Sequence, residues 1–137
     1  MINVLYIDDE ADSEKMLSKF DVLRFFDINV ISEKDLTHLL GKLDIILNGI
    51  DLIVVDMIMP TKDEYNLDDT NGGKHTGIAV IKDIRKVNKK IPIIIVSILH
   101  RNSFDEKLLQ ALNISDFKEK SITAEELSYS IKNNIIN

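Results

Sequence analysis

The sequence predicts an α/β fold in which one doubly wound parallel sheet carries helices on both faces. Short apolar runs alternate along the chain with segments whose apolar residues recur at helical spacing. Two of the runs, Leu52–Val55 and Ile93–Val96, are apolar without interruption, which is typical of parallel strands buried on both faces. Strands that alternate with helices imply βαβ units with right-handed crossovers.

Length and composition place the chain among globular proteins. Its 137 residues predict one domain, 1–137, with 45% hydrophobic and 29% charged residues. A formal net charge of -6 argues against nucleic-acid binding, and the absence of cysteine excludes disulfides and zinc–cysteine sites. The N-terminus does not resemble a signal peptide, and no apolar run approaches the roughly 20 residues of a membrane span. We therefore expect a cytoplasmic protein without a membrane partner.

Three strands and two helices are expected in the first half of the chain. The β-branched and apolar runs that predict the strands are Ile2–Ile7, Ile28–Ile31 and Leu52–Val55. Helical spacing predicts one helix around Met16, Leu17, Phe20 and Leu23, and a second with Leu36, Leu39, Leu40, Leu43, Ile46 and Leu47 on one face. Ser32 is expected to cap the second helix, which Asn48-Gly49 ends.

The second half is expected to add two strands and three helices. The strands are Ile91–Ser97, with a proline at its entrance, and Ile114–Phe117. A helix should begin near Thr76, with Ile78, Ile81 and Ile84 facing inward. Capping boxes at Ser103/Glu106 and Thr123/Glu126 predict the other two helices. The first carries Leu108, Ala111 and Leu112, and the second has Leu127, Ile131 and Ile135 facing inward. The total is five strands and five helices.

The segment Thr61–His75 interrupts this alternation of strands and helices. It is polar, lacks periodicity and carries four acids, Asp63, Glu64, Asp68 and Asp69. A loop of this length is uncommon in a compact domain and is usually functional or disordered. The acids lack calcium-loop spacing, which favours a solvated loop over a calcium site.

Polar residues follow the strands at their carboxyl ends. Asp8 and Asp9 follow the first strand, Asp56 the third, Ser97 the fourth, and Lys120 lies just past the fifth. In a parallel sheet these ends meet at one edge, where α/β proteins bind ligands. Three carboxylates held together favour a hard cation such as magnesium. Taken singly, Asp56 could instead be a strand-end cap, and the acidic pair could cap the first helix.

With these residues in place, the chain resembles the receiver domain of bacterial response regulators. The matches are Ile7-Asp8-Asp9, Val55-Asp56-Met57-Ile58-Met59-Pro60, Thr76-Gly77, Ile95-Val96-Ser97 and Asp116-Phe117-Lys118-Glu119-Lys120. Each motif is weak alone, but their order and strand-end positions make the set specific. The resemblance covers the whole chain and implies a flavodoxin-like sheet of order 2-1-3-4-5.

The resemblance also implies the chemistry of two-component signalling. Asp56 would accept a phosphoryl group from a histidine kinase or phosphotransfer protein in a phosphorelay. Asp9, Asp56 and the backbone carbonyl of Ile58 would hold Mg²⁺, or alternatively Mn²⁺, with Asp8 acting through water. Lys120 and Ser97 would contact the phosphoryl oxygens. Phe117 would be the aromatic residue that changes rotamer as Ser97 moves.

The output implied by the resemblance is a protein contact rather than an enzymatic product. Phosphorylation would repack the face formed by the fourth helix, the fifth strand and the last helix, and dimers could form there. The output partner is unknown, and weak self-dephosphorylation is the only reaction expected beyond phosphoryl acceptance. The 61–75 insertion would serve as a lid, a kinase-selectivity element or a dimer contact.

Three residues depart from the family pattern. Ser121 replaces the proline that usually follows the lysine on a cis bond. A cis bond before a non-proline residue costs about 3 kcal/mol, so a trans bond is expected here. Because a trans bond changes the reach of Lys120, Lys118 is a fallback for it. Bulky Ile98 replaces a small residue, and Ile58 replaces a polar one that helps to position water. We expect phospho-Asp56 to be comparatively long-lived.

Two alternatives belong to other functional classes. A pseudo-receiver would be a binding module that keeps the fold and signals without phosphorylation. An aspartyl-phosphate hydrolase would also use a strand-end aspartate. The hydrolase pattern requires a second aspartate two residues after the nucleophile, where this chain has Ile58.

Overall fold

The computed structural model describes residues 1–61, 64–67 and 69–135. Its elements in chain order are β1 (Ile2–Ile7), α1 (Glu14–Phe25), β2 (Ile28–Glu33), α2 (Leu36–Gly41), α3 (Leu43–Ile46), β3 (Leu52–Asp56), α4 (Thr76–Val87), β4 (Ile93–Ser97), the 3-10 helix η1 (Arg101–Ser103), α5 (Glu106–Ala111), β5 (Asp116–Glu119) and α6 (Ala124–Asn134). No helix among the described residues is long and apolar enough to cross a membrane.

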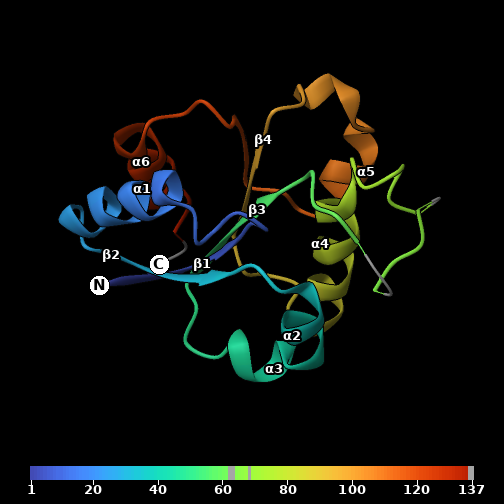
Figure 1. Cartoon of the computed structure of the whole chain (residues 1–137), viewed down its shortest axis with the longest axis horizontal. Helices are drawn as coiled ribbons and strands as arrows, with labels where there is room; N and C mark the ends of the chain where they lie inside the picture. The colour runs from blue at the N-terminus through green and yellow to red at the C-terminus, as the bar shows by residue number, and fades with distance from the viewer. Residues whose placement is uncertain (62–63, 68, 136–137) are drawn as a thin grey trace.

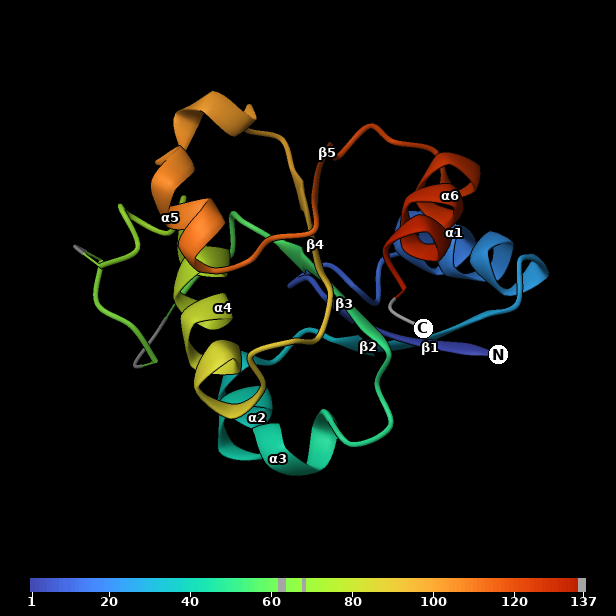
Figure 2. The same cartoon turned by 180° about the vertical axis from the view of Figure 1, so that it is seen from behind.

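The five strands form one parallel sheet of order β2-β1-β3-β4-β5, which confirms the predicted fold class. Helices α1 and α6 lie on one side of the sheet, and α2, α3, α4 and α5 lie on the other (Figures 1 and 2). Strand β3 occupies the centre and is buried along its whole length. Its buried position follows from its uninterrupted apolar sequence, because both faces of a central strand are covered.

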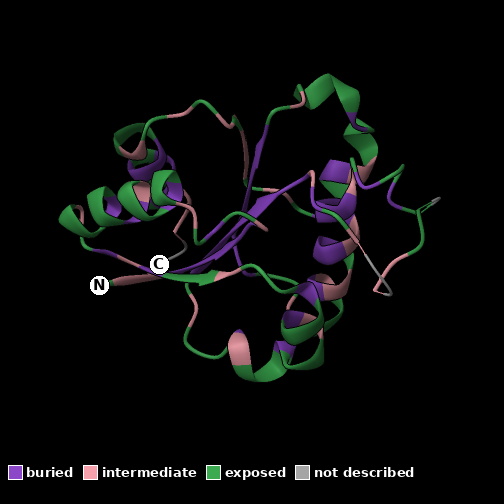
Figure 3. Ribbon diagram, in the orientation of Figure 1, coloured by how far each residue is buried: buried purple, intermediate pink, exposed green. Residues whose placement is uncertain are grey.

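An apolar core lies on each face of the sheet, and Figure 3 shows the buried strands between them. Side chains alternate along each strand, so Val4 and Tyr6 pack with α1 and α6 residues such as Phe20 and Leu127. Leu5 and Ile7 pack on the opposite face with residues of α2, α4 and α5. This two-sided burial fixes the register of the strands and therefore the position of their ends.

The predicted second helix differs from the observed structure in its cap and its continuity. Ser32 does not cap it, because β2 continues through Ser32, which pairs with Tyr6 of β1. The cap is Asp35, whose carboxylate accepts a hydrogen bond from the N–H of His38 at 3.2 Å. The helix then breaks after Gly41, a residue that disfavours helix interiors, so α2 and α3 replace one predicted helix. The described residues therefore contain six α-helices rather than five.

The last third of the chain also needs two corrections. Ser103 lies in η1 and does not cap α5; the cap is Asp105, which accepts a hydrogen bond from the N–H of Lys107. Strands β4 and β5 begin at Ile93 and Asp116, each two residues later than predicted. By contrast, Thr123 caps α6 as predicted and accepts a hydrogen bond from the N–H of Glu126 at 3.1 Å.

Some apolar residues of the predicted helices do not face the core. Leu17 and Ala111 belong to the helical patterns in the sequence but are exposed. Leu109, which was not singled out, takes the inward position in α5 and is almost fully buried. Helix α5 spans only Glu106–Ala111, and so short an apolar pattern leaves its phase poorly defined.

Candidate functional site

The carboxyl ends of four parallel strands meet at one edge of the sheet. Asp8 follows β1, Asp56 ends β3, Ser97 ends β4, and Lys120 follows β5. The pairings Ile7 with Val55 and Asp56 with Val96 hold β1, β3 and β4 in register. Asp8 is fully buried and Asp56 is 3% exposed. The edge thus gathers charged side chains where little water reaches them.

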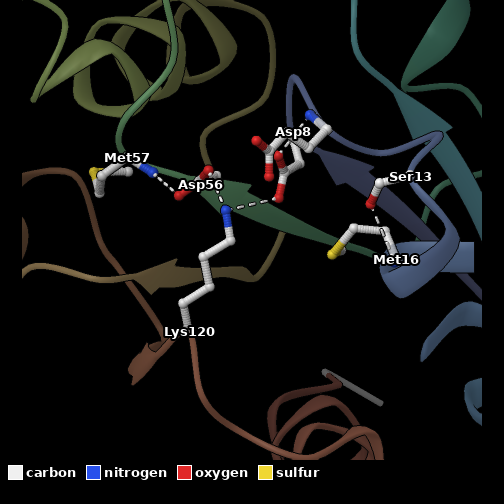
Figure 4. Close-up of polar contacts among 7 residues, drawn as sticks. Asp8, Ser13, Met16, Asp56, Met57 and Lys120 are labelled. Carbon is white, nitrogen blue, oxygen red and sulfur yellow. Dashed lines mark hydrogen bonds and ion pairs between the residues drawn. The ribbon is translucent and has the colours of Figure 1, made fainter. Parts of the chain in front are cut away.

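Lys120 lies between two of the acids (Figure 4). Its Nζ donates to Oδ2 of Asp56 at 2.8 Å and lies 3.3 Å from Oδ2 of Asp8. The Lys120–Ser121 peptide bond is trans, so the lysine reaches the site without the cis bond of the family pattern. Lys118 instead pairs with Asp116 at 3.5 Å, and the geometry therefore favours Lys120 over the fallback.

Asp8, Asp9 and Asp56 form a cluster that suits a metal ion. Each offers a carboxylate oxygen, and these three oxygens lie within 4.8 Å of one another. Oδ1 of Asp56 accepts from the N–H of Met57 at 2.8 Å, and Oδ1 of Asp8 accepts from the N–H of Glu10 at 2.9 Å. Oδ2 of Asp8 is buried, and its contact is the 3.3 Å ion pair with Lys120. Three acids facing one lysine fit a hard divalent cation such as magnesium.

Burial, together with neighbouring charges, shifts the pKa values of these groups. Burial raises the pKa of Asp56 to about 6, with a further increase from Asp8 and a partial decrease from the Lys120 hydrogen bond. The pKa of Asp9 is raised as well, first by burial and then by Asp8. Burial lowers the pKa of Lys120, but its contacts with Asp56 and Asp8 outweigh burial and leave that pKa raised.

Ser97 lies at the site but its hydroxyl is engaged elsewhere. The side chain is fully buried, and Oγ accepts a hydrogen bond from the N–H of Leu99 at 3.0 Å. The Ser97 carbonyl accepts from the N–H of Lys120 at 2.8 Å, so the backbone of Ser97 fixes the start of the Lys120 segment. Because this hydroxyl accepts rather than donates here, its own proton remains available for a group bound at Asp56.

Phe117 is half-buried in β5 and belongs to a row of three rings. Its centroid lies 5.5 Å from that of Phe104, which lies 4.5 Å from the His75 ring. Phe104 was not among the residues predicted to matter, although an isolated aromatic residue in a polar stretch was a signal for burial. Its side chain is 7% exposed. The row joins β5 to the last residue of the 61–75 insertion.

A groove of about 860 Å³ opens beside the site, and Ile58 lies on its wall. Ile98, exposed to 69%, lies on the same wall. Asp9, Asp56 and Lys120 line the end of the groove at the sheet edge. The two isoleucines therefore place apolar surface next to the carboxylates.

Tyr6 is a further residue near the acids that sequence reasoning missed. Its ring packs on Phe20 at 5.0 Å, and its hydroxyl is buried without a hydrogen-bond partner. Burial, followed by the charges of Asp8 and Asp56, raises the pKa of Tyr6. The hydroxyl therefore stays protonated beneath the acidic cluster.

The 61–75 insertion contacts the body of the domain in the parts that the structure describes. Glu64 accepts from the hydroxyl of Thr37 in α2 at 2.6 Å, and the Tyr65 hydroxyl donates to Asp83 of α4 at 2.5 Å. Asp69 is exposed. Of the other acids expected in this loop, Asp63 and Asp68 lie outside the described residues.

Comparisons by structure identify the fold. The chain is similar to a response-regulator receiver domain protein of Clostridium thermocellum, with a TM-score of 0.73 and 23% identity over 98% of this chain and 94% of that one. It is similar to a receiver domain of a Francisella response regulator, with a TM-score of 0.71 and 24% identity over 96% and 94%.

A third similar structure is an orphan response regulator of H. pylori, with a TM-score of 0.66 and 14% identity over 98% of this chain and 97% of that one. No protein-family model and no curated protein matches the chain by sequence. The strand order, the acids at the sheet edge and these likenesses lead to one conclusion: the chain has the fold of a response-regulator receiver domain.

Proposed function

We propose that this domain accepts a phosphoryl group on Asp56 from a histidine kinase or phosphotransfer protein, in a magnesium-dependent reaction. The observation that carries the proposal is Lys120, whose ammonium group lies 2.8 Å from Asp56 and 3.3 Å from Asp8. This arrangement brings together a nucleophile, Asp56, a fixed cation, Lys120, and a set of hard-metal ligands at one edge of the sheet. The solved receiver domains supply the same fold.

Each residue of the site has its own role in the proposed phosphoryl transfer. With a pKa of about 6, the Asp56 carboxyl is mostly ionised at neutral pH and is more basic than an ordinary aspartate. A carboxylate oxygen attacks phosphorus, the phosphorus–nitrogen bond to the donor imidazole breaks, and the imidazole leaves. Lys120 moves from the carboxylate to the phosphoryl oxygens and balances their charge. Asp9, Asp56 and the Ile58 carbonyl would hold magnesium, with Asp8 acting through water, and the ion would supply further positive charge to the phosphoryl group when bound.

The phosphoryl group then changes what Ser97 and Lys120 contact. We expect Ser97 to exchange its hydrogen bond from Leu99 for one to a phosphoryl oxygen. This movement leaves space beside Phe117, and α5, β5 and α6 repack as the signalling surface. Output is then a phosphorylation-dependent protein contact, and the same face is where we place a dimer if one forms.

A pseudo-receiver is the second candidate, and the isoleucines favour it. Ile58 and Ile98 place bulky apolar side chains on the groove through which a phosphoryl donor approaches. Under this alternative the domain would bind its partner without phosphorylation. It predicts that the acidic cluster binds metal without any response to a phosphoryl analogue.

Titration with beryllofluoride and magnesium, followed by amide NMR shifts, separates the two functions. Phosphoryl acceptance predicts shifts around Asp56, Ser97 and Phe117 in the wild type, and their loss in Asp56→Asn. Mass spectrometry after incubation with a small acyl phosphate should show one added phosphoryl group on the same residue. Absence of both responses in a folded wild-type protein would refute phosphoryl acceptance and leave the pseudo-receiver.

A further inference from the structure

The segment that follows β3 is bound tightly to the end of the 61–75 insertion and the start of α4. The N–H of Gly77 donates to the Met57 carbonyl at 3.0 Å, and the N–H of Met59 donates to the Gly73 carbonyl at 3.2 Å. The Thr76 hydroxyl lies 2.6 Å from the Met59 carbonyl and 3.0 Å from that of Gly73. We call Gly73, Thr76 and Gly77 the clamp.

The residues of the clamp are closely packed against the segment that follows β3. Thr76 is fully buried, and its hydroxyl has one proton for two carbonyl acceptors. Gly73 has φ +88, and a Cβ there would lie 3.3 Å from the Met59 carbonyl oxygen. A Cβ at Gly77 would overlap the Asp56 carbonyl oxygen and the Met57 side chain. Larger side chains at either glycine would therefore push the β3 segment out of position.

Ile58 lies between the two clamped residues. Met57 and Met59 are held on either side of it, while none of the clamp contacts uses the Ile58 carbonyl. Ile58 lines the groove together with Asp9 and Asp56. Among the described residues the clamp thus fixes the backbone around this carbonyl without using its oxygen.

The insertion connects the clamp to the rest of the domain. The buried Thr70 accepts from the N–H of Gly73 at 3.2 Å, and its carbonyl accepts from the N–H of His75 at 2.8 Å. Further back, Tyr65 is held by Asp83 of α4. Of the described residues of the insertion, Tyr65 is therefore attached to α4, and Gly73 is attached to the β3 segment.

We infer that the end of the insertion, residues 70–75, together with Thr76 is a positioning element for the metal site: through the clamp, Thr76 holds the Ile58 carbonyl in place for a divalent cation. This inference rests on the proposed function, which makes that carbonyl a magnesium ligand. It assigns Thr76 as a positioning residue, because Thr76 acts through Met59 and not on the ion. Partners that orient a metal ligand in this way change metal affinity by roughly 10-fold to 100-fold when removed.

The test compares Thr76→Val, which deletes the hydroxyl and keeps the shape, with Thr76→Ser, which restores it. Magnesium alone is titrated into each folded variant and followed by amide NMR shifts. Thr76→Val should raise the magnesium Kd roughly tenfold, and Thr76→Ser should return it close to the wild-type value. In metal-free buffer, hydrogen exchange at the Met59 amide should be faster in Thr76→Val only.

Ser128→Ala is the matched control, because it removes a buried hydroxyl that donates to a carbonyl at the same 2.6 Å in α6. It should leave the magnesium Kd unchanged. Equal Kd values for wild type and Thr76→Val, or equal increases in Thr76→Val and Ser128→Ala, would overturn the clamp and leave the proposed function standing. A wild-type protein that binds no magnesium would overturn both.

Gly73→Ala provides a second variant if Thr76→Val does not fold. Its φ of +88 disfavours alanine, so the Gly73 carbonyl should shift and the Kd should rise in the same direction. An unchanged Kd in folded Gly73→Ala would overturn the inference as well.

Discussion

Replacing Asp56 by asparagine should stabilise the magnesium-free protein at neutral pH. The ionised carboxylate is buried beside Asp8, and burial is the main reason that its pKa rises from 3.8 to about 6. Asparagine removes the charge and keeps the size, but its single oxygen replaces only one of the two carboxylate oxygens that accept from Lys120 and from the N–H of Met57. The variant therefore loses little packing and removes a costly charge.

The magnitude follows from the pKa shift. A rise from 3.8 to about 6 is about 2 pK units, and at about 1.4 kcal/mol per unit the ionised form costs roughly 3 kcal/mol of stability. The asparagine amide pairs less strongly with Lys120 than a carboxylate does, so the expected gain is roughly 2 kcal/mol. For a domain of this size that gain raises Tm by roughly 5 to 10 °C.

The direction of the pKa shift determines how the stability of the wild type changes with pH. The folded-state pKa of Asp56 lies above the unfolded value, so the folded state binds more protons between about pH 4 and about pH 6. Wild-type stability therefore falls as pH rises through this window, and the cost is fully present above about pH 6. The advantage of Asp56→Asn should accordingly be largest near pH 7.5 and should disappear near about pH 4.

Urea denaturation in chelator, followed by circular dichroism at both pH values, measures the effect. Asp12→Asn is the matched control, because Asp12 is an exposed carboxylate paired with Lys34 at 2.6 Å, and that pairing lowers its pKa. It should show no gain at neutral pH. Magnesium should then stabilise the wild type and not Asp56→Asn. A variant that is less stable than wild type near neutral pH, or a gain that does not depend on pH, would refute the reasoning.

Three other substitutions test separate parts of the site. Lys120→Met removes the cation at Asp56, and phosphorylation by a small acyl phosphate should slow roughly 100-fold; a rate close to wild type would contradict its role. Ile58→Asn supplies a polar group that can position water, so phospho-Asp56 should hydrolyse roughly tenfold faster, as measured by loss of the phosphorylated mass. Tyr65→Phe deletes the hydrogen bond to Asp83 and should cost about 1 kcal/mol in urea denaturation, whereas exposed Tyr129→Phe should change stability little.

The fold was predictable because burial leaves a long-range pattern in the sequence. Leu52–Asp56 and Ile93–Ser97 are buried along their whole length, and only strands covered on both faces need such runs. Once the strands were parallel, their carboxyl ends had to meet, which brought Asp8, Asp56 and Lys120 together. The spacing of these residues in the sequence does not matter, since the sheet sets their distance.

Helix caps and tertiary contacts were harder to predict from the sequence. Ser32 and Asp35 are both good capping residues three positions apart, and the choice between them depends on how far β2 pairs with β1. The rings of His75 and Phe104, and the Tyr65–Asp83 contact, join segments far apart in the chain. Neither periodicity nor a local motif encodes such pairs, so only the assembled structure reveals them.

The position of Lys120 reconciles burial with reactivity at Asp56. Burial and Asp8 both raise the pKa of Asp56 and so favour the neutral acid, which cannot attack phosphorus. The Lys120 hydrogen bond at 2.8 Å pulls the pKa back to about 6. The carboxylate is then ionised at neutral pH yet more basic than an exposed aspartate, and basicity favours nucleophilic attack. One lysine against three acids is enough to keep Asp56 charged but too little to neutralise the cluster, which is why the edge still favours a divalent cation.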